Sequence, residues 1–402
     1  MDSTLYISNH LIKMNRMVSG TLALPAGTIG IADNAIANAD NIEALSLPAS
    51  LKYIGNNAFA DAYILYSANL PSGLERIGDR AFSGCLALEN VSFGSSLKHI
   101  GEYAFENCNL LRTIELPYSL QTIGDGVFYT CDNLDTVIWN APNVKKISYY
   151  NSHTYSDLFD QCNNFKTLII GDSIRNLLNQ NTNDSVVDLT SNQFSNITSL
   201  RKVVIGNNVN IIGDNAFSGC NRLASVYIPN SVTYIGRYSF QNCDSLRYVE
   251  IPINVEEVAE RAFNSCDSLH TVVWNAKKAI MNGSNSYGNN VFQNCNAVKL
   301  FIIGDSVRYM SDYALRYMHS LDTIIVRGEL DSIGKYAFNS INGLDYLSLE
   351  KGMSSLIKIG EGAFNNCNGF KVDSLILGNR LEHIGNRAFY NCDSIRYVYI
   401  PH

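Results

Sequence analysis

Long apolar runs and clusters of positive charge are both missing from this 402-residue sequence. No stretch approaches the roughly eighteen apolar residues that a membrane-spanning helix requires, so membrane insertion is not expected. Lysine and arginine form nothing longer than the pairs Lys145–Lys146 and Lys277–Lys278, and the formal net charge is −7. Nucleic acid attracts proteins that present a basic stripe, and therefore no nucleic-acid partner is expected.

The common signatures of catalysis and of metal binding are also absent. The seven histidines are scattered, and the sequence has no His-x-x-x-His, no glycine-rich phosphate loop and no Gly-x-Ser-x-Gly elbow. Adjacent acids such as Glu256 and Glu257 point in alternate directions, so they cannot flank one bond of a substrate. We therefore expect no enzyme activity, no catalytic residues, no metal and no cofactor.

The sequence does contain a strict period of aromatic residues. With 46% hydrophobic and only 17% charged residues, the chain is not expected to be disordered. Phenylalanine recurs with a spacing of 23 residues within two sets: Phe59, Phe82, Phe105 and Phe128, then Phe194, Phe217, Phe240 and Phe263. A fixed period of roughly 20–50 residues is typical of a solenoid, in which one coil is too small to bury its own apolar face. Counting by this position gives about fifteen coils.

Residues 220–240 show how one coil is built. Val226 and Ile228 alternate with Tyr227, which predicts a short strand with the tyrosine facing outward. Pro229 ends the strand because proline has no N–H group to donate. An Ile-Gly pair then ends a second short extended segment, where glycine is expected to provide positive φ or close backbone approach. The Ala-Phe-x-x-Cys phrase fits one helical turn.

The repeated pattern Cys-x-x-Leu-x-x-Val-x-Ile-Pro-x-x-Val-x-x-Ile-Gly-x-x-Ala-Phe resembles the BspA-like, or Treponema pallidum-type, leucine-rich repeat. The resemblance implies an α/β fold: a right-handed, β-dominated solenoid with a parallel sheet on one face. It also implies proteins displayed at microbial or protist surfaces that attach to host proteins or to other cells. We expect a lead-in or cap over residues 1–20 and a single solenoid over residues 21–402.

All ten cysteines lie three residues after the phenylalanine position. They are Cys85, Cys108, Cys131, Cys162, Cys220, Cys243, Cys266, Cys295, Cys367 and Cys392. Other coils have isoleucine or methionine at this position, which indicates a buried packing site. Side chains stacked in parallel do not point at one another as a disulfide requires, and a metal needs ligands that converge. We expect a structural ladder, with disulfides and metal binding as the alternatives.

The chain also repeats itself on a larger scale. The first phenylalanine set recurs in the second with a constant shift of 135 residues, which indicates that a five-coil block near 59–158 was duplicated near 194–291. The only two tryptophans, Trp139 and Trp274, are equivalent in the two blocks, and a lengthened coil follows each.

Three lengthened segments are the first candidates for binding. They are residues 148–157, 175–188 and 281–290. Extra residues in a solenoid project from one edge as loops, and these are rich in Asn, Ser and Tyr, as adaptable binding loops are. We name Tyr150, Tyr155 and Tyr287 as candidate partner contacts. The alternative is that the loops are tolerated surface insertions.

The outward face of the predicted sheet is the second candidate. Its outward positions become apolar along two runs, and contiguous exposed apolar area commonly marks an interaction site. The candidate partner contacts are Ile138, Ile169, Val204, Tyr227, Tyr248, Val273, Ile302 and Ile325. Two alternatives remain: β-branched residues simply favour strands, or the long loops cover them.

These observations favour a non-enzymatic recognition or adhesion scaffold that binds a protein or glycoprotein on a host or neighbouring cell. The alternatives are a structural spacer or assembly module of a larger surface protein, and a glycan-binding module that uses the lengthened coils. We expect an extracellular or cell-surface location, although residues 1–20 lack the apolar core of a signal peptide. The array ends without a polar cap, so we expect truncation, further sequence or end-to-end self-association.

Overall fold

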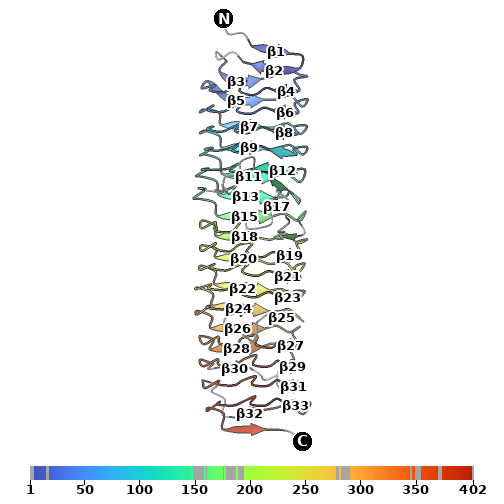
Figure 1. Ribbon diagram of the computed structural model, residues 1–402, viewed down its shortest axis with the longest axis vertical. Helices are drawn as coiled ribbons and strands as arrows, with labels where there is room; N and C mark the ends of the chain where they lie inside the picture. The colour runs from blue at the N-terminus through green and yellow to red at the C-terminus, as the bar shows by residue number, and fades with distance from the viewer. Residues whose placement is uncertain are drawn as a thin grey trace. The chain divides into compact units, whose positions relative to one another are not determined.

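Figure 1 shows the computed structural model of the chain. The structure describes residues 4–14, 18–142, 144–147, 158–159, 161–174, 176–177, 187–188, 194–277, 280–281, 290–344, 346–348, 355–369 and 374–400. These residues form strands and turns but no helix, and hence no helix long and apolar enough to cross a membrane. The chain divides into two compact units, unit 1 with Met1–Ile174 and Gln180–Gln193, and unit 2 with Arg175–Asn179 and Phe194–His402.

Unit 1 has one long strand in each coil, and most consecutive long strands pair in parallel. They are β3 (Gly20–Ala23), β5 (Ile42–Ser46), β7 (Ser67–Asn69), β9 (Asn90–Ser92), β11 (Thr113–Leu116), β13 (Thr136–Trp139) and β15 (Thr167–Ile170). In Figure 1 these strands form one column. The predicted strand over each Val-x-Ile segment is therefore confirmed.

A second column of short strands comes mostly from the Ile-Gly segments of unit 1 (Figure 1). The parallel members are β2 (His10–Lys13), β4 (Gly30–Ile31), β6 (Tyr53–Ile54), β8 (Arg76–Ile77), β10 (His99–Ile100), β12 (Thr122–Gly124) and β14 (Lys145–Ile147). Two antiparallel strands flank them: β1 (Leu5–Ile7) pairs with β2, and β17 (Val187–Asp188) pairs with β14.

Unit 2 repeats this arrangement. Its long strands are β18 (Lys202–Val204), β20 (Ser225–Tyr227), β22 (Tyr248–Ile251), β24 (Thr271–Trp274), β26 (Leu300–Ile303), β28 (Thr323–Val326), β30 (Tyr346–Ser348), β32 (Ser374–Ile376) and β34 (Tyr397–Tyr399). Its short strands are β16 (Asn176–Leu177), β19 (Ile211–Ile212), β21 (Tyr234–Ile235), β23 (Glu257–Val258), β25 (Ile280–Met281), β27 (Tyr309–Met310), β29 (Ser332–Ile333), β31 (Lys358–Ile359) and β33 (His383–Ile384). The predicted solenoid is confirmed in each unit.

The core of each unit contains a stack of phenylalanine rings. In unit 1, Phe59 and Phe82 lie parallel with ring centroids 5.0 Å apart. In unit 2, Phe240 lies 5.4 Å from Phe217 and 5.1 Å from Phe263. All five side chains are fully buried. The period is fixed because each ring packs against the equivalent ring of the adjacent coil. This packing buries the ring faces that a single coil would leave exposed to water.

The helical turn expected for Ala-Phe-x-x-Cys is wrong. Asn57 and Asp61, on either side of Phe59, have φ values of 51° and 60°, which interrupts right-handed helical geometry. The Phe59 N–H donates to the Ala81 carbonyl of the next coil at 2.8 Å instead of to its own turn. This side of the solenoid is therefore a backbone ladder between coils, in which residues of left-handed conformation alternate with the core residues.

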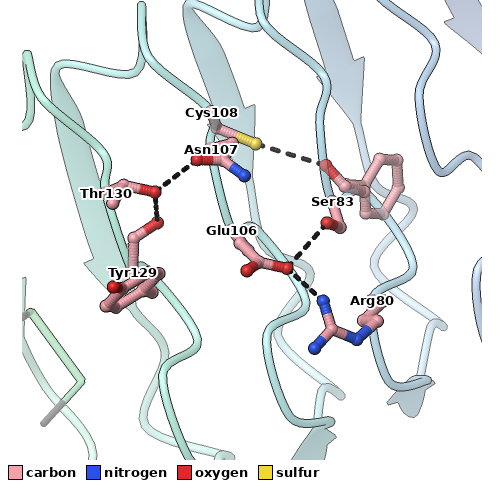
Figure 2. Close-up of polar contacts among 8 residues, drawn as sticks. Arg80, Ser83, Glu106, Asn107, Cys108, Tyr129 and Thr130 are labelled. Carbon is pink, nitrogen blue, oxygen red and sulfur yellow. Dashed lines mark hydrogen bonds and ion pairs between the residues drawn. The ribbon is translucent and has the colours of Figure 1, made fainter. Parts of the chain in front are cut away.

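The cysteines form a second ladder on the same side. Each of the ten thiols donates to the carbonyl oxygen of the phenylalanine in the preceding coil, as Cys108 does to Phe82 at 3.3 Å (Figure 2). Nine are buried and Cys392 is half-buried, and all ten are free thiols. Burial raises the pKa of Cys85 to about 12. The predicted buried packing site is confirmed, and the cross-coil hydrogen bond explains why a thiol suits it.

Glycine is required after the isoleucine because the backbones of adjacent coils approach closely there. A Cβ atom at Gly78 would lie 2.6 Å from the Gly55 carbonyl carbon of the preceding coil. The next residue forms another ladder, since the Asp79 N–H donates to Asn56 Oδ1 at 2.8 Å. Of the two reasons expected for this glycine, close approach is the one that applies. The Asp or Asn after it accepts a hydrogen bond from the N–H group of the equivalent residue in the next coil.

Candidate interaction surface

The long strands have one buried face and one outward face. In β13, Val137 and Trp139 point into the core and are 0% and 4% exposed. The intervening Thr136 and Ile138 point outward and are half-buried. Trp139 also donates its ring N–H to the Ala141 carbonyl at 2.9 Å. The alternation predicted from the sequence is confirmed, and it defines the face on which a partner could dock.

In unit 1 the outward face changes from polar to apolar along the stack. Glu115, Ile138 and Ile169 are paired in register on β11, β13 and β15. Glu115 is exposed, as are Ser46, Asn69 and Ser92 at the same position upstream, whereas Ile138 and Ile169 are half-buried. We call Ile138 and Ile169 the unit 1 stripe. Both side chains are partly accessible, and their role as partner contacts stays a prediction.

The corresponding run in unit 2 is largely closed. Val273 and Ile302 lie outward on β24 and β26 as predicted, but they are only 7% and 8% exposed. The open apolar surface expected at these two residues is therefore not present. The neighbouring outward positions have Tyr248 and Leu300 where unit 1 has threonine, and larger side chains remove more adjacent surface from water.

The remaining predicted sheet residues keep some exposure. Val204 and Ile325 are half-buried. Tyr227 and Tyr248 are 55% and 46% exposed, and they are the aromatic members of this face that the sequence had indicated. The structure brings Val204 and Tyr227 into register on β18 and β20.

The structure reveals equivalent glutamate–asparagine contacts in the two units. Asn140 Nδ2 donates to Glu115 at 2.8 Å, and Asn275 Nδ2 donates to Glu250 at 2.7 Å. In unit 2 the Tyr248 hydroxyl also donates to Glu250, at 2.9 Å. Burial, together with this hydrogen bond, raises the pKa of Tyr248 to about 12. The shift of 135 residues between both members of the two pairs was the available sequence signal.

Charged side chains lie beside both runs. In unit 1 Lys166 is 2.9 Å from Asp135, and in unit 2 Lys299 is 3.9 Å from Asp322. All four side chains are between 39% and 47% exposed. Such exposed ion pairs add little stability, but a polar rim of mixed charge is usual around an apolar contact area.

Three of the predicted contacts lie outside the described residues: Tyr150, Tyr155 and Tyr287, from the lengthened coils.

The structure also shows exposed residues that were not among the predicted contacts. Ile376 and Tyr399, paired on β32 and β34, are 65% and 62% exposed. The Tyr-Val-Tyr alternation of β34 was the signal for them. In the part of the chain that the structure describes, no group of three or more His, Cys, Asp or Glu residues could hold a metal ion.

Comparison with known proteins gives one family. The chain matches the family described as BspA type leucine-rich repeat region, in six copies, over residues 29–166, 152–287 and 285–402. No curated protein matches the chain.

Solved structures are similar at low identity. A leucine-rich repeat protein from Bacteroides ovatus is 21% identical, with a TM-score of 0.44 and coverage of 97% of this chain and 88% of that one. A leucine-rich cell surface protein from Faecalibacterium prausnitzii is 17% identical, with a TM-score of 0.33 and coverage of 82% and 94%. The T. pallidum leucine-rich repeat protein is 22% identical, with a TM-score of 0.33 and coverage of 53% and 82%.

Proposed function

Because the chain belongs to the BspA-type leucine-rich repeat family, we propose that it is a recognition scaffold that binds a protein or glycoprotein outside the cell and catalyses no reaction. Stacked coils present many outward side chains at fixed spacings, which suits recognition of an extended partner surface. The hydrogen bonds between adjacent coils hold these positions before a partner arrives, so little ordering entropy opposes binding.

The observation that carries this proposal is the unit 1 stripe. Ile138 and Ile169 are half-buried neighbours on paired strands, and the Glu115–Asn140 hydrogen bond and the Lys166–Asp135 ion pair lie beside them. Apolar residues at the centre of a contact with polar groups around them are typical of protein interfaces. Unit 2 has two exposed tyrosines on its own outward face, Tyr227 and Tyr248, whose rings offer large contact area at low entropic cost.

The test compares capture of extracellular-matrix and cell-surface proteins by the wild-type chain and by Ile138→Lys/Ile169→Lys. Asn69→Lys/Ser92→Lys is the matched control, because it adds the same two charges at exposed, polar positions of the same outward face. We expect the double variant to lose the captured partner and the control to keep it, with thermal unfolding little changed in both. Retention of the partner by the double variant would refute this placement.

A further inference from the structure

Five large apolar side chains are exposed on three successive coils of unit 1. They are Tyr63, Ile64 and Tyr66 before β7, Leu86 before β9 and Leu110 before β11 (Figure 1). Their exposed fractions lie between 39% and 50%. We call these five residues the Tyr63 patch. Contiguous exposed apolar surface commonly marks an interaction site.

Four of the five residues occupy the centre of a tight turn, which does not require apolar side chains. In each of the three coils the leucine after the turn donates its N–H to the carbonyl three residues earlier, as Leu65 does to Ala62 at 3.2 Å. In adjacent coils the same two positions have Asp40–Asn41 and Asp132–Asn133, residue types that favour turns. Of the fifteen coils, only these three have a large apolar residue there. Formation of the turn therefore does not explain these side chains.

The ladder between coils fixes the neighbours within the patch. The N–H of Ala87, in the second turn, donates to the Tyr63 carbonyl at 3.2 Å. The Tyr66 N–H donates to the Glu43 carbonyl at 2.9 Å, and the Glu89 N–H donates to the Tyr66 carbonyl at 3.0 Å. Because equivalent residues of adjacent coils lie about 4.8 Å apart, a glutamate lies on each side of Tyr66 along the stack.

The charged residues around the patch are mainly acidic. Asp40, Glu43, Glu89 and Asp132 are exposed, and so is Arg112. Within the ranges that the structure describes, neither Glu43 nor Glu89 forms an ion pair. Their charges therefore remain available to a partner.

Apolar side chains beside exposed carboxylates suit a partner segment that is both apolar and basic. A cation on the face of a tyrosine ring is attracted by the ring, and adjacent carboxylates add to that attraction. Two copies of the patch placed face to face would bring their own acidic groups together, and an anionic membrane surface would be repelled. We propose that the Tyr63 patch docks a segment of a protein partner that combines apolar residues with lysine or arginine, one cation being placed on Tyr66.

The first test is a fluorescence-anisotropy titration of a labelled synthetic peptide of alternating leucine and lysine with the full chain. Two matched peptides separate the contributions, since one has glutamate in place of lysine and the other has serine in place of leucine. We expect the leucine–lysine peptide to saturate in roughly the micromolar range and each matched peptide to bind at least about tenfold more weakly. No saturation by the leucine–lysine peptide, or equal binding of either matched peptide, would overturn the proposal.

The second test removes the apolar and the acidic groups separately. Tyr63→Ser/Leu86→Ser removes apolar area, and Glu43→Gln/Glu89→Gln removes the charges beside Tyr66. Each should weaken binding of the leucine–lysine peptide by at least about tenfold. Thermal unfolding should change little, because all four sites are exposed. Unchanged affinity in either folded variant would contradict the assignment.

Matched controls come from exposed positions of unit 2. Tyr390→Ser/Ile376→Ser removes the same kinds of side chain from sites that are 60% and 65% exposed, and Glu256→Gln/Glu382→Gln removes two exposed carboxylates. Both controls should keep wild-type affinity. A loss in a control equal to that in its patch variant would show that the peptide responds to the overall apolarity or charge of the chain, and would overturn the assignment to the patch.

Two measurements distinguish other occupants of the patch. Light scattering of the full chain should show no dimer that the Tyr63→Ser/Leu86→Ser variant loses. Vesicles that contain phosphatidylserine should show no binding that the same variant loses. Either observation would identify a second copy or a membrane as the occupant and would overturn the proposal.

The Tyr63 patch and the unit 1 stripe are tested independently. Ile138→Lys/Ile169→Lys should keep affinity for the leucine–lysine peptide within about twofold, because both residues lie on later coils, where added charge is screened from the patch. A larger loss in that variant would show that the peptide binds the stripe and would overturn the assignment. Capture through the stripe should survive in Tyr63→Ser/Leu86→Ser, so that each proposal can fail without the other.

Discussion

The strands around the two tryptophans have the same backbone pairing but different outward surfaces. We call β11, β13 and β15 the Trp139 strands, and β22, β24 and β26 the Trp274 strands. Both sets pair in parallel with the same register, bury a tryptophan and place a glutamate next to an asparagine. Yet Ile138 is half-buried while its equivalent Val273 is only 7% exposed.

The neighbouring stripe also differs between the two sets. The Trp139 strands have Thr113 and Thr167 there, whereas the Trp274 strands have Tyr248 and Leu300. The two sets therefore have the same core. They differ in a few outward residues and in whether the outward apolar run is accessible or covered. A duplicated block is free to diverge in this way because outward residues are not part of the buried core that joins the coils.

The largest effect should come from the core that the two sets share. Trp139→Ala and Trp274→Ala each remove a side chain at most 4% exposed, so each should lower the free energy of unfolding by about 3–5 kcal/mol. Urea unfolding followed by circular dichroism measures this loss. Trp139→Phe and Trp274→Phe, which keep an aromatic ring, should cost clearly less. A loss below about 1 kcal/mol in either alanine variant would contradict an equivalent buried role.

The surfaces should respond differently to the same charge. Ile302→Lys places an ammonium group at a site 8% exposed and should cost about 2–3 kcal/mol, whereas Ile169→Lys, at a half-buried site, should cost less than about 1 kcal/mol. Thermal and urea unfolding measure both values. Equal costs would mean that the two runs do not differ in accessibility.

A double-mutant cycle sharpens this point. In a Tyr248→Thr/Leu300→Thr background, which copies the neighbouring stripe of the Trp139 strands, Ile302→Lys should become less costly by about 1 kcal/mol. An unchanged cost would show that other side chains cover Ile302.

The cysteine ladders should behave alike in both units. Cys108→Ser and Cys243→Ser each place a more polar hydroxyl at a buried site and should lower the free energy of unfolding by about 1–2 kcal/mol.

Burial raises the pKa of both Cys85 and Cys220 to about 12, so these thiols should react slowly at pH 8 in the folded protein. A thiol titration should count ten free thiols after unfolding, with half-buried Cys392 the most reactive before it. Fewer than ten would indicate disulfides.

The smallest effect should come from Tyr248, on the Trp274 strands, where the Trp139 strands have Thr113. Tyr248→Phe removes the hydrogen bond to Glu250 and should cost less than about 1 kcal/mol at neutral pH. Because the pKa of Tyr248 is raised to about 12 in the folded protein from about 10 in the unfolded chain, its contribution is complete below pH 10 and is lost as the pH rises through 12. Melting temperatures of wild type and variant should therefore converge over this interval. A constant difference would contradict the hydrogen bond.

Much of the fold was predictable from residue spacing. The recurrence of Phe59 and Phe82 after 23 residues implied one coil per period, and the alternation around Tyr227 implied a strand. The turn after Gly55 was not predictable as such, because Ala-Phe-x-x-Cys has the spacing of a helical turn. Its true conformation depends on hydrogen bonds to the adjacent coil, and no periodicity within one coil reports those bonds.

The candidate sites were predictable only in part. The alternation placed Ile138 and Val273 on the outward face correctly, but their exposure depends on which side chains neighbour them across strands. A cavity of unit 2 is lined by Asn294 of one coil and by Arg316 and Tyr317 of the next. The departures of residues 315–319 from the repeat were visible in the sequence, but no single-coil pattern shows that they enclose a volume.

The sequence by itself determined the coil, its strands, the buried phenylalanine and cysteine positions and the outward direction of each strand residue, because these follow from local periodicity repeated many times. Only the tertiary structure decided which outward residues stay accessible, why the turns are not helical and where a cavity opens. Those properties arise between coils: a side chain's exposure and a backbone group's hydrogen-bond partner are set by residues about one period away.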